Sequence, residues 1–166
     1  ERVKAGYPKK GLIWHFQGSG KSLLMVFAAQ KLRMIPELKN PTVVIIDDRI
    51  DLETQMTATF NASDIPNLVG IATKDDLIKF FQHDTRKIAI TTIFRFGDVE
   101  EKLNDRDNIV VMVDEAHRTQ EGNLGEKMRL ALPNAFFFGL TGTPINRLDK
   151  NTFKTFGAIE DKSGYM

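Results

Sequence analysis

The sequence predicts an α/β domain with a mostly parallel central sheet, and two observations carry this prediction. Short apolar runs rich in β-branched residues alternate with segments of helical pattern, as they do in βαβ units. The strongest runs are continuously apolar rather than alternating, which is typical of strands covered by helices on both faces. We therefore expect one domain that spans residues 1–166.

The expected strands are short runs of apolar, mostly β-branched or aromatic residues. They cover residues 11–14, 42–46, 87–91, 109–113 and 135–140, with a weaker candidate over 69–72. Helical patterns lie between these runs, at residues 22–34, 50–60, 74–82 and 125–132. Pro36 stops the first of these helices, because proline lacks the N–H group that a helix interior needs.

Composition sets broad limits on function. The 166 residues are 42% hydrophobic and 27% charged, which is ordinary for a globular domain with a real core. The absence of cysteine excludes a disulfide scaffold and a cysteine-based zinc site. No apolar run approaches the roughly 18 residues that span a bilayer, so we expect no membrane segment. A net charge of +1 neither favours nor excludes a nucleic-acid partner.

A glycine-rich turn that ends in Gly-Lys-Ser joins the first strand to the first helix, as in a P-loop. In such a loop, backbone N–H groups and the helix N-terminus hold phosphates. Lys21 would reach the β- and γ-phosphates, and the Ser22 hydroxyl would hold Mg²⁺. The usual spacing places a glycine where this chain has His15, and Gln17 either shapes the loop or faces solvent. The expected nucleotide-binding residues are Gln17, Gly18, Ser19, Gly20, Lys21 and Ser22.

An acidic pair follows the apolar strand over 109–113, as in the Walker B pattern. Asp114 is expected to hold the Mg²⁺ of a bound nucleotide, and Glu115 to orient and deprotonate the attacking water. Both residues then lie at the carboxyl end of a strand, where open α/β sheets bind ligands. The alternative is a solvated acidic turn after a core strand. Together with Lys21, the two carboxylates form the expected catalytic set.

The strand over 135–140 runs directly into Thr141-Gly142-Thr143-Pro144. Taken alone, this tetrapeptide is a turn, because glycine and proline interrupt regular structure and threonines form local hydrogen bonds. Together with the P-loop and the acidic pair, however, it is the third loop that directly follows an apolar strand. Three such loops in this order favour a nucleotide site over three unrelated turns.

These motifs carry a family resemblance. Gly-Lys-Ser, Asp-Glu-Ala-His and Thr-Gly-Thr-Pro, in this order, resemble motifs I, II and III of superfamily 2 helicases and translocases. The longer segments H-F-Q-G-S-G-K-S after G-L-I-W, V-V-I-I-D-D-R-I-D-L-E-T-Q, I-T-T-I-F-R-F and D-E-A-H-R-T-Q resemble the motor (R, restriction) subunit of type I restriction-modification enzymes. His15 is normal at its position in that family. The resemblance covers residues 11 to about 157, and it implies a RecA-like P-loop NTPase fold, a three-layer sandwich around the sheet.

The resemblance also implies a function. The chain would be the ATP-binding half of an ATP-dependent double-stranded DNA translocase within a type I site-specific deoxyribonuclease, with ATP and Mg²⁺ as its cofactors. Its partners would be double-stranded DNA and the methyltransferase and specificity subunits, in a bacterial or archaeal cytoplasm. Because the chain begins at Glu1, we expect a fragment of a longer protein. The nuclease domain and a second RecA-like domain would lie outside it, and the isolated fragment would be poorly active.

Further residues are expected to have roles beyond the nucleotide site, most of them from the same resemblance. For Thr91 and Thr92 the reason is chemical, because hydroxyls at a strand end can hydrogen-bond phosphates. His117, Thr141, Gly142 and Thr143 are expected to couple the nucleotide site to movement, and Arg49, Gln55, Thr91 and Thr92 are the candidate DNA contacts. Arg49 has an alternative in a salt bridge with Asp48 or Asp51. Phe94 and Phe96 could stack on bases, but we expect both in the core.

Three alternatives stay open at this point: another superfamily 2 ATPase domain, a P-loop nucleotide kinase, and an ATP-binding module without catalysis. The order of strands in the sheet distinguishes a superfamily 2 ATPase domain from a P-loop nucleotide kinase. In a RecA-like sheet the strand over 135–140 lies between those over 11–14 and 109–113. Direct pairing of the latter two would indicate the kinase topology.

Overall fold

The computed structural model describes residues 2–6, 9–14, 20–47, 67–115 and 123–142 of the chain. Its strands are β1 (Lys10–Trp14), β2 (Thr42–Asp47), β3 (Leu68–Gly70), β4 (Ile88–Thr92), β5 (Ile109–Val113) and β6 (Phe136–Thr141). Its helices are α1 (Arg2–Ala5), α2 (Lys21–Arg33), α4 (Lys74–Gln82) and α5 (Leu124–Ala131), with 3-10 turns η1 (Pro36–Leu38) and η2 (Ile93–Phe96). The strand over 109–113 and the helix over 74–82 have the bounds expected from sequence. The helix expected over 50–60 lies outside the described residues.

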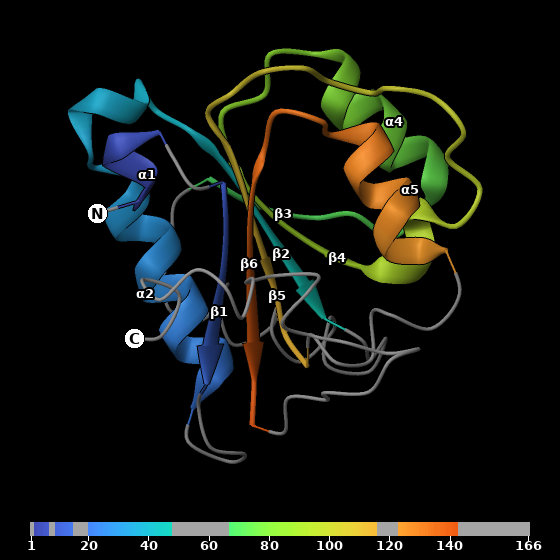
Figure 1. The fold of residues 1–166 in the computed structure, drawn as a ribbon. Helices are drawn as coiled ribbons and strands as arrows, with labels where there is room; N and C mark the ends of the chain where they lie inside the picture. The colour runs from blue at the N-terminus through green and yellow to red at the C-terminus, as the bar shows by residue number, and fades with distance from the viewer. Residues whose placement is uncertain (1, 7–8, 15–19, 48–66, 116–122, 143–166) are drawn as a thin grey trace.

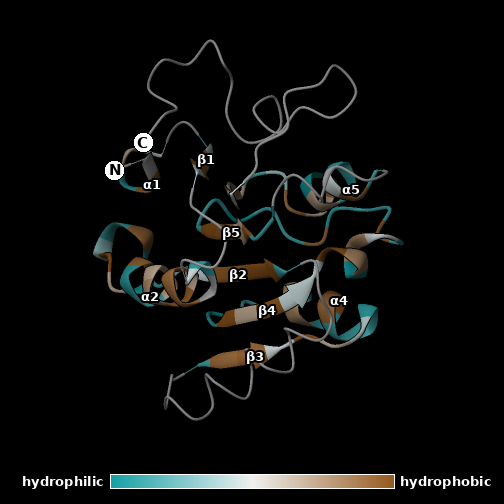
Figure 2. Ribbon diagram, turned by 90° about the horizontal axis from the view of Figure 1, so that it is seen from below, coloured by the Kyte–Doolittle hydropathy of each residue, from teal (hydrophilic) through white to brown (hydrophobic). Residues whose placement is uncertain are grey.

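The strands form one six-stranded sheet in the order β1-β6-β5-β2-β4-β3, and every pair in it is parallel. Helices α1 and α2 cover one face, and α4 and α5 cover the other (Figure 1). A view turned by 90° shows the same three layers, with apolar strands between the helices (Figure 2). The expected three-layer α/β sandwich is therefore confirmed.

Strand β6 lies between β1 and β5. In the parallel register Trp14 pairs with Thr141, and Val113 pairs with Gly139. The carboxyl ends of these three strands consequently meet at one edge of the sheet. This order is the one expected of a RecA-like domain, and β1 does not pair directly with β5 as in a kinase-like sheet.

Alternation along the central strands divides the apolar core into two halves. In β2, Val43 and Ile45 pack toward α2, whereas Val44 and Ile46 pack toward α4 and α5. The α2 side also holds Met25, Val26, Ala29, Ile88, Ile90, Val110, Met112, Phe136 and Leu140. The other side holds Leu77, Phe80, Phe81, Ala89, Phe96, Val111, Val113, Met128 and Phe137, among others. Burial on both faces explains why the strands read as continuous apolar runs.

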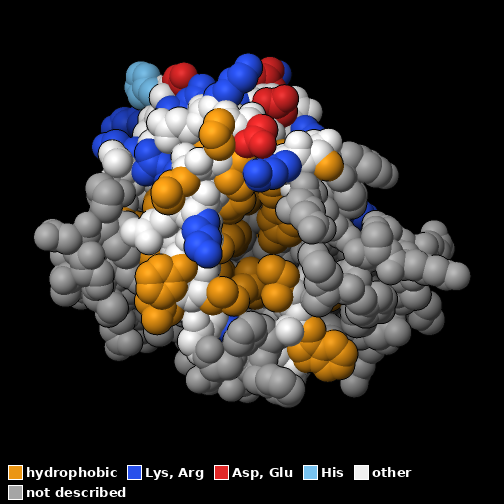
Figure 3. Space-filling view, turned by 90° about the vertical axis from the view of Figure 1, so that its left-hand side faces the viewer, with side chains coloured by type: hydrophobic (Ala, Val, Ile, Leu, Met, Phe, Trp, Pro, Cys, Tyr) orange, Lys and Arg blue, Asp and Glu red, His pale blue; other side chains and the backbone are white. Residues whose placement is uncertain are grey.

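Helix α2 is apolar on its outer side as well as on its inner side. Leu23, Leu24 and Phe27 remain 51%, 40% and 54% exposed. Apolar side chains gather on the side of the molecule that lies at the left in Figure 1 (Figure 3).

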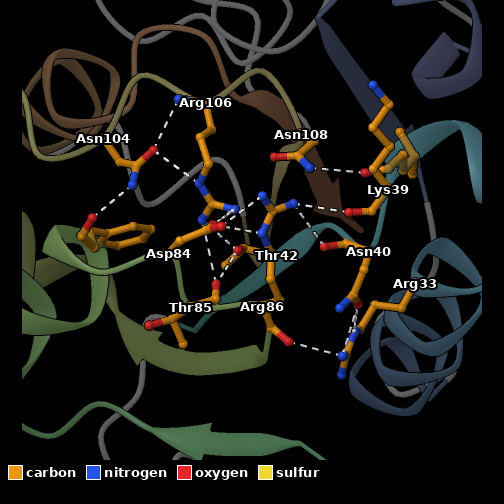
Figure 4. Close-up of polar contacts among 12 residues, drawn as sticks. Arg33, Lys39, Asn40, Thr42, Asp84, Thr85, Arg86, Asn104, Arg106 and Asn108 are labelled. Carbon is orange, nitrogen blue, oxygen red and sulfur yellow. Dashed lines mark hydrogen bonds and ion pairs between the residues drawn. The ribbon is translucent and has the colours of Figure 1, made fainter.

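Arginines join the loops at the amino ends of the strands (Figure 4). Arg86 donates to both oxygens of Asp84, at 2.6 and 3.1 Å, and to the backbone carbonyl of Lys39 at 3.0 Å. Arg106 lies 3.0 Å from the Asp84 carboxylate and donates to the Thr42 hydroxyl at 2.8 Å. The network fixes the start of β2 and the loops that lead into β4 and β5, at the edge opposite the motif loops.

Within the described ranges, none of the helices is both long enough and apolar enough to cross a bilayer.

Candidate active site

Two elements far apart in sequence bring Lys21 against the acidic pair. Lys21 is the first residue of α2, and Asp114 and Glu115 directly follow β5. The Lys21 ammonium group donates a hydrogen bond to Glu115 Oε1 and lies 3.6 Å from Asp114 Oδ1. Three of the residues expected to be catalytic thus form one cluster at the carboxyl ends of parallel strands, where such sheets bind ligands.

Gly20 shapes the entry to α2. Its φ of 79° and ψ of 31° lie in the left-handed region, which glycine adopts without the steric penalty of a Cβ. Its carbonyl accepts a hydrogen bond from the Leu24 N–H at 3.0 Å, which starts the helix at Lys21. The first N–H groups of a helix have no partner within it, and Gly20, as the N-cap residue, has no side chain that could cap them. These donors are suited to an anion, as expected for a phosphate loop.

Two of the three charged residues are buried, and Glu115 is partly exposed. Lys21 is 7% exposed and Asp114 is 6% exposed. A buried charge is costly unless an opposite charge or hydrogen bonds compensate it, and here one ammonium faces two carboxylates. Burial raises the pKa of the Asp114 carboxyl, although the N–H of Glu115 and the charge of Lys21 act to lower it.

The backbone of Glu115 is held in an uncommon conformation. Its φ of 45° is left-handed, and its N–H donates to Asp114 Oδ1 at 2.8 Å. The Asp114 N–H continues the sheet by donating to the Ile46 carbonyl at 2.8 Å. Non-glycine residues with this backbone are concentrated at functional sites, where neighbouring contacts hold the strain. This backbone conformation directs the Glu115 side chain toward Lys21.

The loop after β6 meets the end of β1. Thr141, the last residue of β6, is completely buried and pairs with Trp14. The indole Nε1–H of Trp14 donates to the carbonyl of Gly142 at 3.1 Å. Of the residues expected to couple nucleotide and movement, Thr141 and Gly142 therefore lie beside the strand that leads into the P-loop. His117 and Thr143 lie outside the described residues.

A family model described as SWI2/SNF2 ATPase matches residues 1–164. The chain belongs to the SWI2/SNF2 ATPase family. It is 42% identical over 170 residues to the type I restriction enzyme HindI endonuclease subunit of Haemophilus influenzae, covering 89% of this chain and 16% of that protein. It is 38% identical over 154 residues to the putative type I restriction enzyme MjaIXP endonuclease subunit of Methanocaldococcus jannaschii, covering 89% and 14%. The chain thus spans 14–16% of the length of these curated relatives, and the resemblance to type I restriction subunits is confirmed.

Solved structures support the fold of this SWI2/SNF2 ATPase domain. The helicase domain of Pyrococcus furiosus Hef superposes with a TM-score of 0.64 at 19% identity, covering 94% of this chain and 34% of that one. The UvsW helicase of bacteriophage T4 gives 0.62 at 23% identity, covering 94% and 56%. The type ISP restriction-modification enzyme LlaGI, solved with a DNA substrate mimic, gives 0.58 at 14% identity, covering 99% and 18%. At these identities the likeness concerns the fold, and it confirms the expected RecA-like architecture.

Only two of the four candidate DNA contacts of this SWI2/SNF2 ATPase lie among the described residues. Arg49 and Gln55 lie outside the described residues. Thr91 and Thr92 are completely buried, and the Thr91 hydroxyl already donates to the carbonyl of Ile71 at 3.1 Å. The buried Thr92 hydroxyl has no hydrogen-bond partner in the described part of the chain. Neither threonine presents its hydroxyl at the surface here, so their expected phosphate contacts gain no support from the geometry.

The two phenylalanines after β4 differ from each other. Phe96 is completely buried, as expected. Phe94 is 57% exposed, so the expectation that it belongs to the core was wrong. The 3-10 turn η2 begins at Ile93, directly after the strand. Alternation along a strand therefore no longer decides which side chain points inward.

The cluster fits a magnesium ion held together with phosphates. The described residues hold no group of three or more histidine, cysteine or acidic side chains that could form a metal cage. Mg²⁺ does not require one, because it is usually bound through one or two carboxylates plus phosphates and keeps several waters. Asp114 offers such a carboxylate. Ser22 is the second residue of α2, and Gln17, Gly18 and Ser19 lie outside the described residues.

Sequence reasoning did not single out Trp14. The only signals were its place as the last residue of an apolar strand before the P-loop and the N–H group that a tryptophan carries. Neither signal predicts a contact with a loop 128 positions away.

Proposed function

We propose that this SWI2/SNF2 ATPase domain binds and hydrolyses ATP as one half of a double-stranded DNA translocase, in the endonuclease subunit of a type I restriction enzyme. The observation that carries the proposal is the buried cluster of Lys21 with Asp114 and Glu115, which joins the start of α2 to the end of β5. The similarity to the HindI and MjaIXP endonuclease subunits supports the wider assignment.

Each residue of the cluster has a distinct task in this proposal. Lys21 and the N–H groups at the start of α2 hold the negative charge of the terminal phosphates. Asp114 and Ser22 would hold Mg²⁺, which when bound neutralises the charge that develops on the phosphates. Glu115 orients the attacking water and accepts its proton.

The partners follow from the relatives and are part of the same proposal. They are double-stranded DNA and the methyltransferase and specificity subunits of a restriction-modification complex, in the cytoplasm of a bacterium or an archaeon. The relatives come from Haemophilus influenzae and Methanocaldococcus jannaschii. Arg49 and Gln55 remain candidate DNA contacts, and His117, Thr141, Gly142 and Thr143 remain candidates for coupling hydrolysis to movement.

Substitution of Lys21 in the full-length enzyme tests the proposal. Lys21→Ala is expected to abolish ATP hydrolysis and translocation, because the lysine stabilises the charge of the phosphates. The variant should also be less stable, because Asp114 loses a buried counter-charge, so circular dichroism must show that it is folded before its turnover is compared. Lys31→Ala is the matched control, since Lys31 is an exposed lysine of the same helix. Wild-type turnover in a folded Lys21→Ala enzyme would refute the assignment. Phosphorylation of a nucleoside monophosphate without any DNA dependence would instead favour a kinase.

A further inference from the structure

Two exposed lysines lie at the amino ends of the strands, at the edge of the sheet opposite the motif loops. Lys39 lies between η1 and β2, and Lys87 directly precedes β4. Within the described part of the chain, neither ammonium group has a hydrogen bond or an ion pair. Arg86, the neighbour of Lys87 in sequence, donates to the carbonyl of Lys39 at 3.0 Å. Arg86 therefore joins two segments that each present an unpaired cation at the surface.

Arginines add further positive charge around Arg86. Arg86 and Arg106 share the carboxylate of Asp84, at 2.6 and 3.0 Å, and Arg33 donates to the backbone carbonyl of Arg86 at 2.9 Å (Figure 4). Among the described residues, Asp84 is the one carboxylate within ion-pair distance of these three arginines. Together with the two lysines they form what we call the amino-edge cluster: Arg33, Lys39, Arg86, Lys87 and Arg106.

The other carboxylates near the cluster in sequence do not neutralise it. Glu37 is paired with Lys4 at 3.4 Å, and Asp105 is paired with Lys102 at 2.9 Å. Asp107 is exposed, but even with its charge included the cations of the cluster outnumber the carboxylates. The amino-edge cluster therefore carries an excess of positive charge, which attracts an anionic partner.

The backbone holds Lys39 in a conformation that lysine rarely adopts. Lys39 and Asn40 are consecutive left-handed residues, with φ of 50° and 56°. Asparagine is enriched in this region, whereas a lysine has no such preference. The turn is stabilised by its neighbours, because Arg86 donates to the carbonyls of both residues and Arg33 donates to Asn40 Oδ1. Glycine would suit this backbone better, so the fold alone does not account for a lysine at this position.

We infer that the amino-edge cluster is a second contact surface for double-stranded DNA, in which Lys39 and Lys87 bind backbone phosphates without reading sequence. The inference rests on the proposed function, because it requires an enzyme that acts on double-stranded DNA. Protein–DNA interfaces are more polar and much more positively charged than protein–protein interfaces. Lysine is depleted in protein–protein interfaces, so two unpaired lysines fit a phosphate backbone better than an acidic protein surface.

Removal of the Lys39 charge in the full-length enzyme tests the inference. Each phosphate contact contributes roughly 0.9 to the slope of the logarithm of the DNA-binding constant against the logarithm of salt concentration. Lys39→Gly is expected to reduce this slope by about 0.9 and to weaken binding of a duplex of arbitrary sequence about eight-fold at about 0.1 M salt. Fluorescence anisotropy of a labelled duplex, without nucleotide, measures both quantities.

The stability of the same variant separates a DNA contact from a structural role. The thermal midpoint of Lys39→Gly should not fall, because glycine relieves the left-handed backbone. A merely structural role would lower the midpoint and leave the salt slope unchanged. Lys39→Arg keeps the positive charge and should retain the wild-type slope.

Lys79→Gln is the matched control, because Lys79 is an exposed lysine of α4 outside the cluster. It should leave affinity and slope unchanged, and an equal loss in this variant would overturn the inference by showing an effect of net charge alone. Wild-type affinity and slope in both Lys39→Gly and Lys87→Gln would also overturn it. Weaker association with other subunits, at unchanged DNA binding, would overturn it in favour of a protein partner. Failure of the proposed function is distinguishable, since it appears as ATP turnover that does not depend on Lys21.

Discussion

The ammonium group of Lys21 donates a hydrogen bond to the carboxylate of Glu115, 94 positions further along the chain. Lys21, which is proposed to bind phosphate, and Glu115, which is proposed to activate water, are therefore hydrogen-bonded to each other. A phosphate oxygen competes with Glu115 for the same ammonium group. Under the proposed function, binding of ATP would have two effects: it would compensate the buried charge of Lys21, and it would release Glu115 to accept a proton from water.

Glu115→Gln is expected to lower the rate of ATP hydrolysis by roughly 10²- to 10⁴-fold, the usual contribution of a general base. The affinity for ATP should be retained or increased, because a neutral amide competes less strongly with phosphate for Lys21. Single-turnover hydrolysis and equilibrium binding measure the two quantities separately. Glu126→Gln, at an exposed residue of α5, is the control. Hydrolysis at the wild-type rate in Glu115→Gln would remove Glu115 from the mechanism.

Asp114→Asn is expected to stabilise the fold at neutral pH and to weaken Mg²⁺-dependent binding of ATP. Burial raises the pKa of the Asp114 carboxyl, so the folded protein binds this proton more tightly than the unfolded chain does. The charged form therefore costs stability in full above the raised pKa, and the cost shrinks as the pH falls from the raised pKa to the ordinary pKa of the unfolded chain. The thermal midpoint of the variant should exceed that of the wild type at pH 7.5, by a margin that shrinks toward acid pH.

Asp107→Asn is the control for this pH dependence, since Asp107 is an exposed carboxylate outside the site. A margin that stayed constant from pH 7.5 to acid pH would show that the effect of Asp114→Asn does not come from titration of this carboxyl.

Gly20→Ala is expected to lower the free energy of unfolding by about 1–2 kcal/mol, the cost of a left-handed backbone for an L-residue. Apart from its chain neighbours, no heavy atom of the described residues lies within 4 Å of the place where a Cβ would be, so the cost is conformational rather than steric crowding. Affinity for ATP should fall as well, because the start of α2 is displaced. Urea unfolding and nucleotide binding measure these effects.

Gly6→Ala provides a closely matched control. Gly6 has a φ of 77° and equally open surroundings, but it precedes β1 rather than following it. Its substitution should cost similar stability and leave ATP affinity unchanged. Equal loss of ATP affinity in both variants would mean that the effect at Gly20 reflects general destabilisation.

Arg106→Gln is expected to destabilise the domain by about 1–3 kcal/mol, because it leaves the hydroxyl of the buried Thr42 without its arginine donor. The side chain of Arg106 is only 18% exposed and donates to the Thr42 hydroxyl. Lys102→Gln removes an exposed ion pair with Asp105 and should change stability by less than about 1 kcal/mol. Equal urea midpoints for the two variants would show that the network contributes no more than a surface pair.

The sheet could be predicted from sequence because its strands are buried on both faces. The run Ile109–Val113 is apolar at every position, and such a short apolar run favours a strand that is buried on both faces. The placement of β6 between β1 and β5 followed from the resemblance to RecA-like domains that the three motifs carry, rather than from local pattern. Apolar strands and motif loops can both be recognised in short stretches of the sequence.

The details of the site could not be predicted in this way. The left-handed backbone of Glu115 depends on Asp114 and on Lys21, which the fold brings from a distant helix. Phe94 and Phe96 have the same chemistry and nearly the same position, yet a 3-10 turn exposes one and buries the other. Local sequence does not reveal where alternation along a strand stops.

The arginine network at the amino ends of the strands has a consequence for hydrogen exchange. Arg86 and Arg106 connect the start of β2 to the loops that lead into β4 and β5, so these three strands are expected to open as one cooperative unit. Their backbone amides should exchange slowly and at a common rate, whereas those of the edge strands β1 and β3 should exchange sooner. Under the proposed function, a rearrangement around the nucleotide could then take place at one edge while the rest of the sheet keeps its register.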